Sequence, residues 1–586
     1  MKPGDKLEKP KDRKGSLVRL GRYLFRYRLS FFCAFVMNLG GNLLALAGPY
    51  LAGKAVDAIH PGAVDFQQVF FYAGWMAVCY VCSAVLSLAL QFLMLSISRR
   101  VVYQMRRDVF NHLLTLPAGY FDTRQTGDIL SRISYDIDTI NTSLSSDVIQ
   151  LMTTAVTVVG SFVMMILVSK ELVLVFCITV PLSLCITRFI VGKTRPLFKR
   201  RSRAMGALNG YGEEQVTGQK TLKAYHQEEN RQQMFDQVNH EAVDAYYRSE
   251  YYSSITGPLV NFVNNLSLTL ISVLGAVLFL FGRMSAGRIS SFVLYSRKFS
   301  GPINEAANIL SELQSALAAA ERVFAVLDEA PEKADKPGAL ELKNTKGEVE
   351  LSHVAFGYEP GKLIFKDLSL HAKPGSLVAI VGPTGAGKTT LINLLMRFYD
   401  ANSGKVIVDG RPVEDWTRES LRKAYAMVLQ DTWLFTGTVY ENLSYGREGV
   451  SREQVEAAAR AAGIHSFISR LPQGYDTVLN EEGSNVSKGQ KQLLTIARAM
   501  LLDAGMLILD EATSNVDTRT ERRIQAAMTK LMEGKTCFVI AHRLSTIRNA
   551  DWILVMNHGE VIEQGTHDSL MAKGSFYRRL YEAQFQ

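Results

Sequence analysis

The stretch Gly382–Thr389 reads GPTGAGKT and follows directly on the apolar run Ser376–Val381, which predicts a β-strand. An apolar helical pattern begins beyond it, at Leu391. Strand, glycine loop and helix in this order are the context in which the pattern GxxxxGK[ST] binds phosphate. The glycines let backbone N–H groups converge on phosphate oxygens, and the helix N-terminus adds its positive end. The stretch therefore predicts a nucleoside-triphosphate site in an α/β domain.

A second apolar run, MLILDE (Met506–Glu511), predicts a strand that ends in two acids. Taken alone, two acids at a strand end are more often a helix cap, but the upstream phosphate loop favours a catalytic role. Asp510 is then placed to hold Mg²⁺, usually through water, and Glu511 to polarise the attacking water. Lys388 should reach the β- and γ-phosphates, and Thr389 should ligate Mg²⁺.

Long uncharged runs fill the first half of the chain. A helix needs about twenty apolar residues to cross the hydrocarbon core, so most of these runs qualify alone. The short run from Leu172 is extended past Arg188 by Phe189, Ile190 and Val191. The five runs are Leu29–Gly53, Phe66–Ser98, Val148–Ser169, Leu172–Thr187 and Tyr251–Gly282.

A sixth span is expected at Ile289–Ser296, although Arg297 and Lys298 interrupt it. An even number of spans returns the chain to the cytoplasm, where an ATP-binding domain must lie. Short outer connections and long basic inner ones place both termini in the cytoplasm. The segment GSLVRLGRYLFRYR (15–28) reads as an interfacial helix along the inner leaflet, or alternatively as an ordinary basic flank.

The chain has 586 residues and a net charge of +9, so its length predicts at least two domains. A basic chain could bind nucleic acid, but much of the excess lies directly after apolar runs, around Arg99–Arg107 and Lys193–Arg203. That position is typical of cytoplasmic membrane flanks. We therefore expect membrane lipid, and no nucleic acid, among the partners.

The motifs around the phosphate loop resemble the ATP-binding cassette family. Tyr358 stands where the family stacks an aromatic ring on adenine, and Gln430 matches the glutamine that senses Mg²⁺. VSKGQKQ (Val486–Gln492) matches the signature usually written LSGGQ. SNVD (Ser514–Asp517) matches the loop after the catalytic acid, and His542 in IAHRLST matches the histidine that contacts the γ-phosphate.

In this family two ATP-binding domains dimerise head to tail, so the signature contacts a nucleotide held by the opposite chain. The resemblance implies that Glu511, His542 and Gln430 are catalytic and that Thr389, Gln430 and Asp510 hold Mg²⁺. It also implies a set of residues that bind ATP: Tyr358, Gly382, Pro383, Thr384, Gly385, Ala386, Gly387, Lys388, Thr389 and Thr390, with Ser487, Gly489 and Gln490 acting across the dimer.

The first half resembles the membrane part of exporters in the same family. FDTRQTGDILSRISYDI (Phe121–Ile137) and EEQVTGQKTLKAYHQEEN (Glu213–Asn230) look like cytoplasmic loops whose coupling helices dock on the ATP-binding domain. Glu482, in the segment NEEGSN (Asn480–Asn485), would contact these loops. The implied fold is a six-helix, all-α transmembrane domain fused to an α/β P-loop domain. Its expected parts are an N-terminus and elbow helix (1–28), the spans (29–328), a linker (329–345) and the ATPase domain (346–586).

The implied function is ATP-driven export of a lipophilic or amphipathic substrate, a drug or a lipid, across the cytoplasmic membrane by alternating access. Two alternatives stay open: an importer, and a cassette protein that gates a channel or senses a ligand. Arg297 and Lys298 could meet an anionic substrate in a wet cavity, or could lie near the outer interface and snorkel. Asn38, Asn42, Asn261, Asn264 and Asn265 could line a cavity or bond neighbouring helices.

The signature departs from the family at Lys488, where a glycine is usual. Glycine lets the backbone approach phosphate closely, whereas lysine adds bulk and charge. A mild interpretation is a homodimer that tolerates the substitution. The interpretation that we favour on sequence is a heterodimer, in which this chain supplies working Walker residues and a partner half-transporter supplies the intact signature.

Overall fold

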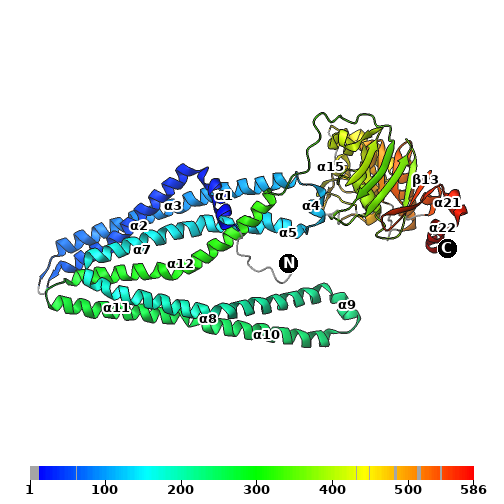
Figure 1. Cartoon of the computed structure of the whole chain (residues 1–586). Helices are drawn as coiled ribbons and strands as arrows, with labels where there is room; N and C mark the ends of the chain where they lie inside the picture. The colour runs from blue at the N-terminus through cyan, green and yellow to red at the C-terminus, as the bar shows by residue number, and fades with distance from the viewer. Residues whose placement is uncertain are drawn as a thin grey trace. The chain divides into compact units, whose positions relative to one another are not determined.

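The computed structural model describes residues 12–60, 63–359, 361–430, 432–445, 447, 449–480, 485–510, 517–541 and 544–585. They form two compact units, coloured along the chain in Figure 1. The helical unit holds the described residues up to Leu116 together with Arg124–Pro331. The α/β unit holds Glu332–Gln586 and one short segment from far upstream, Pro117–Thr123.

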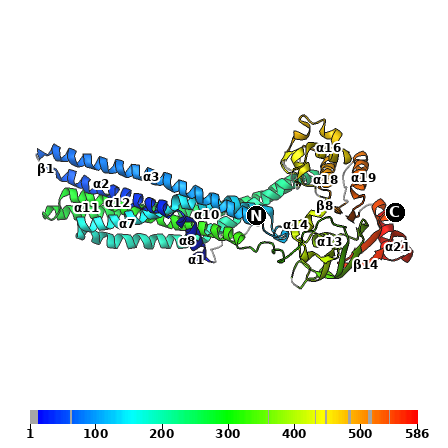
Figure 2. The ribbon, with the colours of Figure 1, turned by 90° about the horizontal axis from the view of Figure 1, so that it is seen from above.

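Long helices make up the helical unit and run alongside one another in both views (Figures 1 and 2). Helix α2 packs against α3, α12 against α2 and α7, and α8 against α10 and α11. The main helices are α1 (Arg13–Phe25), α2 (Arg28–Asp57), α3 (Phe66–Leu113), α7 (Val148–Val168), α8 (Lys170–Thr217), α10 (Glu228–Ser254), α11 (Thr256–Leu280) and α12 (Ala286–Leu327). Shorter elements connect them: α5 (Thr126–Ser131), η1 (Arg132–Asp136), α6 (Ile137–Thr142), η2 (Ser143–Asp147) and α9 (Gln219–Ala224).

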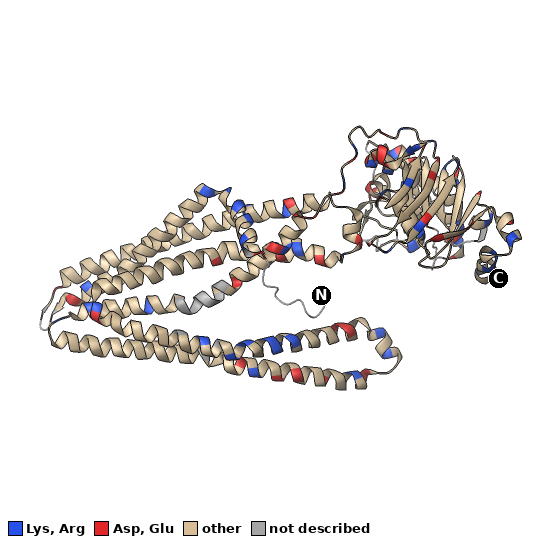
Figure 3. Cartoon of the chain, in the orientation of Figure 1, with Lys and Arg blue, Asp and Glu red and all other residues tan. Residues whose placement is uncertain are grey.

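Five stretches of described helix are long and apolar enough to cross a membrane, and each covers all or nearly all of one of the five predicted runs. They are Arg28–Asp57, Phe66–Leu113, Thr126–Val168, Lys170–Thr217 and Glu228–Leu280. Their charge-free parts are the long tan stretches of Figure 3, whereas residues coloured blue and red gather on α10 and the second half of α8. The sixth predicted span lies in α12, whose 42 residues also carry Arg297 and Lys298.

Helix α1 is held to the end of α12 by an ion pair and by a cation–aromatic contact. The Arg19 guanidinium pairs with Asp328 at 2.5 Å and lies 4.4 Å from the centre of the Phe324 ring. The leucines of this helix differ in exposure, because Leu20 is buried in the unit while Leu17 is exposed. An exposed leucine beside a basic surface is typical of an interfacial helix.

Polar side chains join α2 to α7. The Asn38 amide donates to Thr153 Oγ1 at 2.7 Å, and Thr157 Oγ1 donates to Asn42 Oδ1 at 3.2 Å. Of the two roles open to these asparagines, the structure thus supports bonding between neighbouring helices.

The α/β unit contains a six-stranded sheet in the order β14-β13-β5-β12-β11-β8 and a four-stranded antiparallel sheet in the order β4-β3-β6-β7. In the larger sheet β13, β5, β12, β11 and β8 are parallel and only β14 is antiparallel. The strands are β3 (Val349–Phe356), β4 (Phe365–Ala372), β5 (Leu377–Val381), β6 (Ser403–Val408), β7 (Arg411–Pro412), β8 (Tyr425–Val428), β11 (Met506–Asp510), β12 (Thr536–Ile540), β13 (Trp552–Asn557) and β14 (Glu560–Gly565).

Helices cover this sheet and build two buried apolar cores with it. The central strands are almost wholly apolar, as parallel strands buried on both faces require. The helices are α13 (Lys388–Leu395), α14 (Arg418–Lys423), α15 (Val439–Ser444), α16 (Arg452–Ala461), α17 (His465–Ile468), α18 (Lys488–Leu502), α19 (Thr518–Met532), α20 (Leu544–Arg548), α21 (His567–Lys573) and α22 (Phe576–Phe585).

Ion pairs with helix α14 hold the first residues of the α/β unit in place. Arg422 holds the Glu332 carboxylate with both terminal nitrogens, and the buried Arg418 donates to Asp335. The predicted linker is therefore anchored to α14 over these residues and is not a free tether there.

A buried carboxylate fastens η1 to α12 in the helical unit. The Asp136 side chain is only 4% exposed and accepts two hydrogen bonds from the Arg322 guanidinium, at 2.9 and 2.5 Å. Removing the cation would leave the acid buried without this partner, which typically costs about 3–5 kcal/mol. Arg322 itself is half-exposed, so we expect about 3 kcal/mol here.

We therefore expect Arg322→Met to lower the apparent unfolding temperature of the purified, detergent-solubilised protein by several degrees. Arg248→Met is the control, since it removes a solvent-exposed pair with Asp244 that is worth less than about 1 kcal/mol. Differential scanning fluorimetry measures both. Equal shifts for the two variants would contradict a structural role for the buried pair.

Candidate nucleotide-binding site

The loop after β5 takes backbone conformations that favour glycine. Gly385 and Gly387 have φ of 81° and 97°, in the left-handed region. A Cβ on Gly387 would lie 2.8 Å from Cε1 of Phe365, and one on Gly382 would lie 2.2 Å from the carbonyl oxygen of Met556. The loop is thus pressed against β4 and β13, and it ends at the N-terminus of α13, where backbone N–H groups have no helical partners.

Lys388 is the first residue of α13, and its ammonium reaches back over the loop. It donates to the carbonyl oxygens of Gly382 at 2.7 Å and Pro383 at 3.0 Å. Burial lowers the pKa of this ammonium, while the carboxylate of Asp510 opposes that shift. The geometry thus places a positive charge inside a cradle of backbone amides, which is the chemistry of a polyphosphate site.

Asp510 reaches the same edge of the sheet because the strands are parallel. Ile380 of β5 pairs with Ile540 of β12, which in turn pairs with Asp510 of β11. The phosphate loop follows the end of β5, so loop and acid meet at the carboxyl ends of the strands. This is where open α/β sheets bind ligands.

Two oxygen donors at this edge fit Mg²⁺. Thr389 is exposed on the first turn of α13, and Asp510 is close enough to influence Lys388. Among the described residues no group of three or more His, Cys, Asp or Glu side chains forms a metal site. One or two protein oxygens together with substrate phosphates are the usual ligands of Mg²⁺ in nucleotide sites.

Tyr358 provides an aromatic surface beside α13. Its ring is 44% exposed, its hydroxyl donates to Thr390 Oγ1 at 3.3 Å, and the Asn393 amide donates to that hydroxyl at 3.0 Å. The Tyr399 ring meets it edge to face with centroids 4.9 Å apart. These contacts fix the ring of Tyr358 and leave it accessible for stacking on a base.

Tyr399 also contacts the upstream segment of the α/β unit, which contains α4 (Ala118–Asp122). Its hydroxyl donates to Asp122 Oδ2 at 2.7 Å, and a Cβ on Gly119 would lie 2.9 Å from the Tyr399 ring. The predicted motifs do not include Tyr399. Its position in RFYD (397–400), directly after the phosphate-loop helix, was the signal available.

The signature residues form the N-terminus of α18. Ser487 is the N-cap and forms a capping box with Gln490, in which each side chain accepts from the other residue's backbone N–H. Gly489 is buried, and Lys488 is exposed in the first turn. The positive end of a helix attracts anions, but the contact of this turn with a nucleotide of the opposite chain stays a prediction.

Of the remaining predicted residues, Gln430 is exposed just after β8. Glu511, His542, Glu482 and most of the SNVD loop lie outside the described residues. Asp517, the last residue of that loop, is the N-cap of α19, and its carboxylate accepts from the backbone N–H groups of Arg519 and Thr520. Hydrogen bonds from Thr520 lower the pKa of Asp517.

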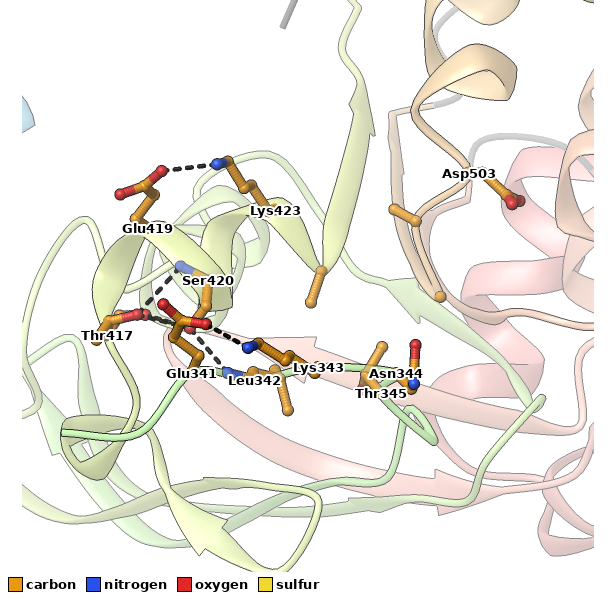
Figure 4. Close-up of a pocket in the computed structure, with 13 residues that line it drawn as sticks. Glu341, Leu342, Lys343, Asn344, Thr345, Thr417, Glu419, Ser420, Lys423 and Asp503 are labelled. Carbon is orange, nitrogen blue, oxygen red and sulfur yellow. Dashed lines mark hydrogen bonds and ion pairs between the residues drawn. The ribbon is translucent and has the colours of Figure 1, made fainter. Parts of the chain in front are cut away.

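A cavity of about 480 Å³ lies elsewhere in the α/β unit, between residues 341–345, α14 and Asp503–Gly505 (Figure 4). The two lysines that line it are already neutralised: Lys343 pairs with Glu341 and Lys423 with Glu419. The cavity contains none of the predicted nucleotide-site residues, and its paired charges offer no net attraction to phosphate.

Two family models match the chain: "ABC transporter transmembrane region" over residues 31–303 and "ABC transporter" over residues 365–514. A fatty acid ABC transporter ATP-binding/permease protein of Mycobacterium bovis is 43% identical over 524 residues, which are 89% of this chain and 83% of that protein. An ATP-dependent lipid A-core flippase of Pseudomonas aeruginosa is 35% identical over 596 residues, covering 98% of each chain.

A solved structure described as a bacterial Atm1-family ABC exporter with ATP bound is similar over 95% of this chain and 98% of its own, with a TM-score of 0.75 and 30% identity. The match confirms the predicted fold class, a six-helix membrane part fused to an α/β ATPase. ABC exporters dimerise, so the working unit contains two such chains. The chain therefore belongs to the ABC transporter family, as an ATP-driven, multi-pass exporter of the bacterial inner membrane whose α/β unit binds ATP.

Proposed function

We propose that the chain hydrolyses ATP between its own phosphate loop and the signature of a second chain, and that this drives export of an anionic amphipathic lipid. The observation that carries the ATPase assignment is the phosphate loop, in which Lys388 bridges Gly382 and Pro383 beside Asp510.

The proposed roles of the site residues combine the positions described above with the resemblance to the family. Tyr358 stacks on adenine, the amides of 382–390 bind the phosphates, and Lys388 transfers its hydrogen bonds from loop carbonyls to phosphate oxygens. Thr389, Asp510 and Gln430 would hold Mg²⁺, which would neutralise the charge that develops on the phosphates. Glu511 orients and deprotonates the attacking water, and His542 contacts the γ-phosphate. Ser487, Gly489 and Gln490 close the site from the opposite chain.

The substrate class is inferred from the relatives and from one charge. Two relatives are named for a fatty acid and for lipid A-core, both of which are amphipathic and anionic. Arg297, in the sixth span, is exposed and forms no ion pair with the residues that the structure describes. A cation at this depth is costly unless it faces water or an anion. An acid headgroup with an acyl chain fits both observations.

The second chain of the dimer is proposed to be another copy of this chain, which makes the transporter a homodimer. Lys488 stands in the first turn of α18 with its side chain in solvent, so the bulk of this side chain need not block the backbone of that turn. Its charge would face the γ-phosphate of the opposite chain, where a cation is favourable. The heterodimer favoured on sequence remains the alternative outcome of the pairing experiment.

Coupling between the two parts is proposed to run through Tyr399. Its ring contacts Tyr358, the proposed adenine platform, and its hydroxyl holds Asp122 of the α4 segment. A base stacking on Tyr358 would fix the pose of Tyr399 and with it that of α4. The chain enters α4 directly after α3, so α4 is the proposed coupling helix.

We expect palmitate, used as the probe, to stimulate ATP hydrolysis by the protein in proteoliposomes and to be carried in an ATP-dependent manner into inside-out vesicles. Arg297→Met should raise the palmitate concentration needed for half-maximal stimulation several-fold and leave basal hydrolysis unchanged. Export of a neutral probe with no effect of palmitate would overturn the substrate class.

We expect Glu511→Gln to lower ATP hydrolysis at least about 100-fold and to retain ATP binding, because it removes the general base. Normal hydrolysis by Glu511→Gln would overturn the catalytic assignment.

We expect a tagged copy, coexpressed with an untagged copy of the same chain in its native membrane, to copurify with that untagged copy in equal amount. Mass spectrometry of the purified complex reads out the composition. A different half-transporter in equal amount, without the untagged copy, would establish the heterodimer instead.

We expect Tyr399→Phe to keep basal ATP hydrolysis within about twofold and to reduce its stimulation by palmitate, because the bond to a charged acceptor is lost while the ring stays. Hydrogen exchange over 117–123 should rise in the ATP-bound Glu511→Gln background. Tyr440→Phe is the matched control, since it loses a 2.6 Å bond to the Val450 carbonyl elsewhere in the unit. Unchanged exchange and stimulation in Tyr399→Phe would contradict this route.

A further inference from the structure

Helix α2 contains a proline that removes one of its hydrogen bonds. Pro49 has no N–H, so the carbonyl oxygen of Ala45, four residues earlier, has no donor in its own helix. In hydrocarbon an unpaired carbonyl costs several kcal/mol and must find a partner elsewhere. Helix α2 nevertheless continues from Arg28 to Asp57.

Helix α12 supplies that partner. The ammonium of Lys298 donates to the Ala45 carbonyl oxygen at 2.8 Å. One turn away the Tyr295 hydroxyl donates to the Leu46 carbonyl at 2.6 Å, and Ser291 Oγ donates to the Pro49 carbonyl at 2.9 Å. The spacing of 291, 295 and 298 puts the three donors on one face of α12. Each donates to a carbonyl of α2 close to Pro49.

The two helices are also in close backbone contact beyond these bonds. A Cβ on Gly53 would lie 2.5 Å from the Gly287 carbonyl oxygen, and one on Gly287 would lie 2.0 Å from that of Gly53. Asp57 accepts from the backbone N–H of Gly287 at 2.7 Å, at the start of α12. We call this continuous contact, from Ala45 to Asp57 and from Ser285 to Lys298, the α2–α12 seam.

The depth of Lys298 argues against snorkelling. It lies twelve residues into α12 from Ala286, or about 18 Å along the axis, which is more than half of a 30 Å hydrocarbon core. Its side chain is half-buried and points at α2, with the Tyr80 ring 5.9 Å from the ammonium. Arg297, the adjacent residue, is exposed. The structure thus separates two neighbouring cations that the sequence presents as one feature.

We propose that Lys298 is a positioning residue that replaces the hydrogen bond lost at Pro49 and fastens α2 to α12, so that the two helices move as one body when the substrate path opens and closes. Its charge is used within the protein and is not offered to the substrate. This goes beyond the proposed export of an anionic lipid and does not depend on it, because the seam is defined by the contacts within one chain.

The test is a double-mutant cycle between Lys298 and Pro49. Lys298→Met keeps the length of the side chain and removes its donor, while Pro49→Ala restores an N–H for the Ala45 carbonyl. We expect Lys298→Met alone to lower the apparent unfolding temperature by about 2–4 °C, to increase hydrogen exchange over 45–57, and to reduce ATP-driven palmitate transport several-fold. In the Pro49→Ala background the same substitution should have little effect on all three. Lys298→Arg should retain most of the wild-type behaviour.

Arg297→Met is the matched control, since it removes the neighbouring cation outside the seam, and it should leave unfolding temperature and exchange unchanged. An equal effect of Lys298→Met with and without Pro49 would overturn the proposal. So would a Lys298→Met protein with normal stability and exchange and a weakened response to palmitate, since Lys298 would then be a substrate ligand. If Lys298→Met alone does not fold, recovery in Pro49→Ala/Lys298→Met supports the seam and failure to recover overturns it. Stability and exchange need no substrate, so failure of the lipid assignment leaves this test intact.

Discussion

Parallel pairing of β5, β12 and β11 is the constraint on which the rest of the ATP site depends. Equal register in these strands brings the end of β5 and the end of β11 to one edge, so the phosphate loop and Asp510 meet although more than a hundred residues separate them. The start of α13 follows the loop, and its side chains Lys388 and Thr390 then connect the loop to Asp510 on one side and to Tyr358 on the other. A shift of one residue in this sheet would separate the groups.

Features set by fixed local spacing were predictable from the sequence. The phosphate loop, its flanking strand and helix, and the five apolar runs follow from short-range patterns, and the structure has the corresponding strands and helices there. The signature pattern did not predict the start of α18, where Ser487 and Gln490 cap the helix. Glu511 and His542 stay predictions, because they lie outside the described residues.

Contacts between distant segments could not be predicted in the same way. Tyr399 and Asp122 are 277 positions apart, and no pattern in one sequence joins them. Arg297 and Lys298 look equivalent in sequence, yet neighbouring side chains on a helix point about 100° apart, so packing against α2 decides which one is engaged. Pro49 leaves the Ala45 carbonyl without a helical donor, and the donor that satisfies it depends on how α12 lies. In each case tertiary packing carries information that local pattern lacks.

The α4 segment makes the membrane half and the ATPase half of the gene depend on each other when related genes recombine. Although it is encoded within the membrane half, Pro117–Thr123 completes the surface of the α/β unit, with Gly119 against the ring of Tyr399 and Asp122 on its hydroxyl. Recombination between related genes at the linker would therefore separate a residue pair that must fit together. Chimaeras, whether natural or engineered, are compatible only when positions 119, 122 and 399 come from matched parents, so these positions should change together in evolution while the linker between the halves varies.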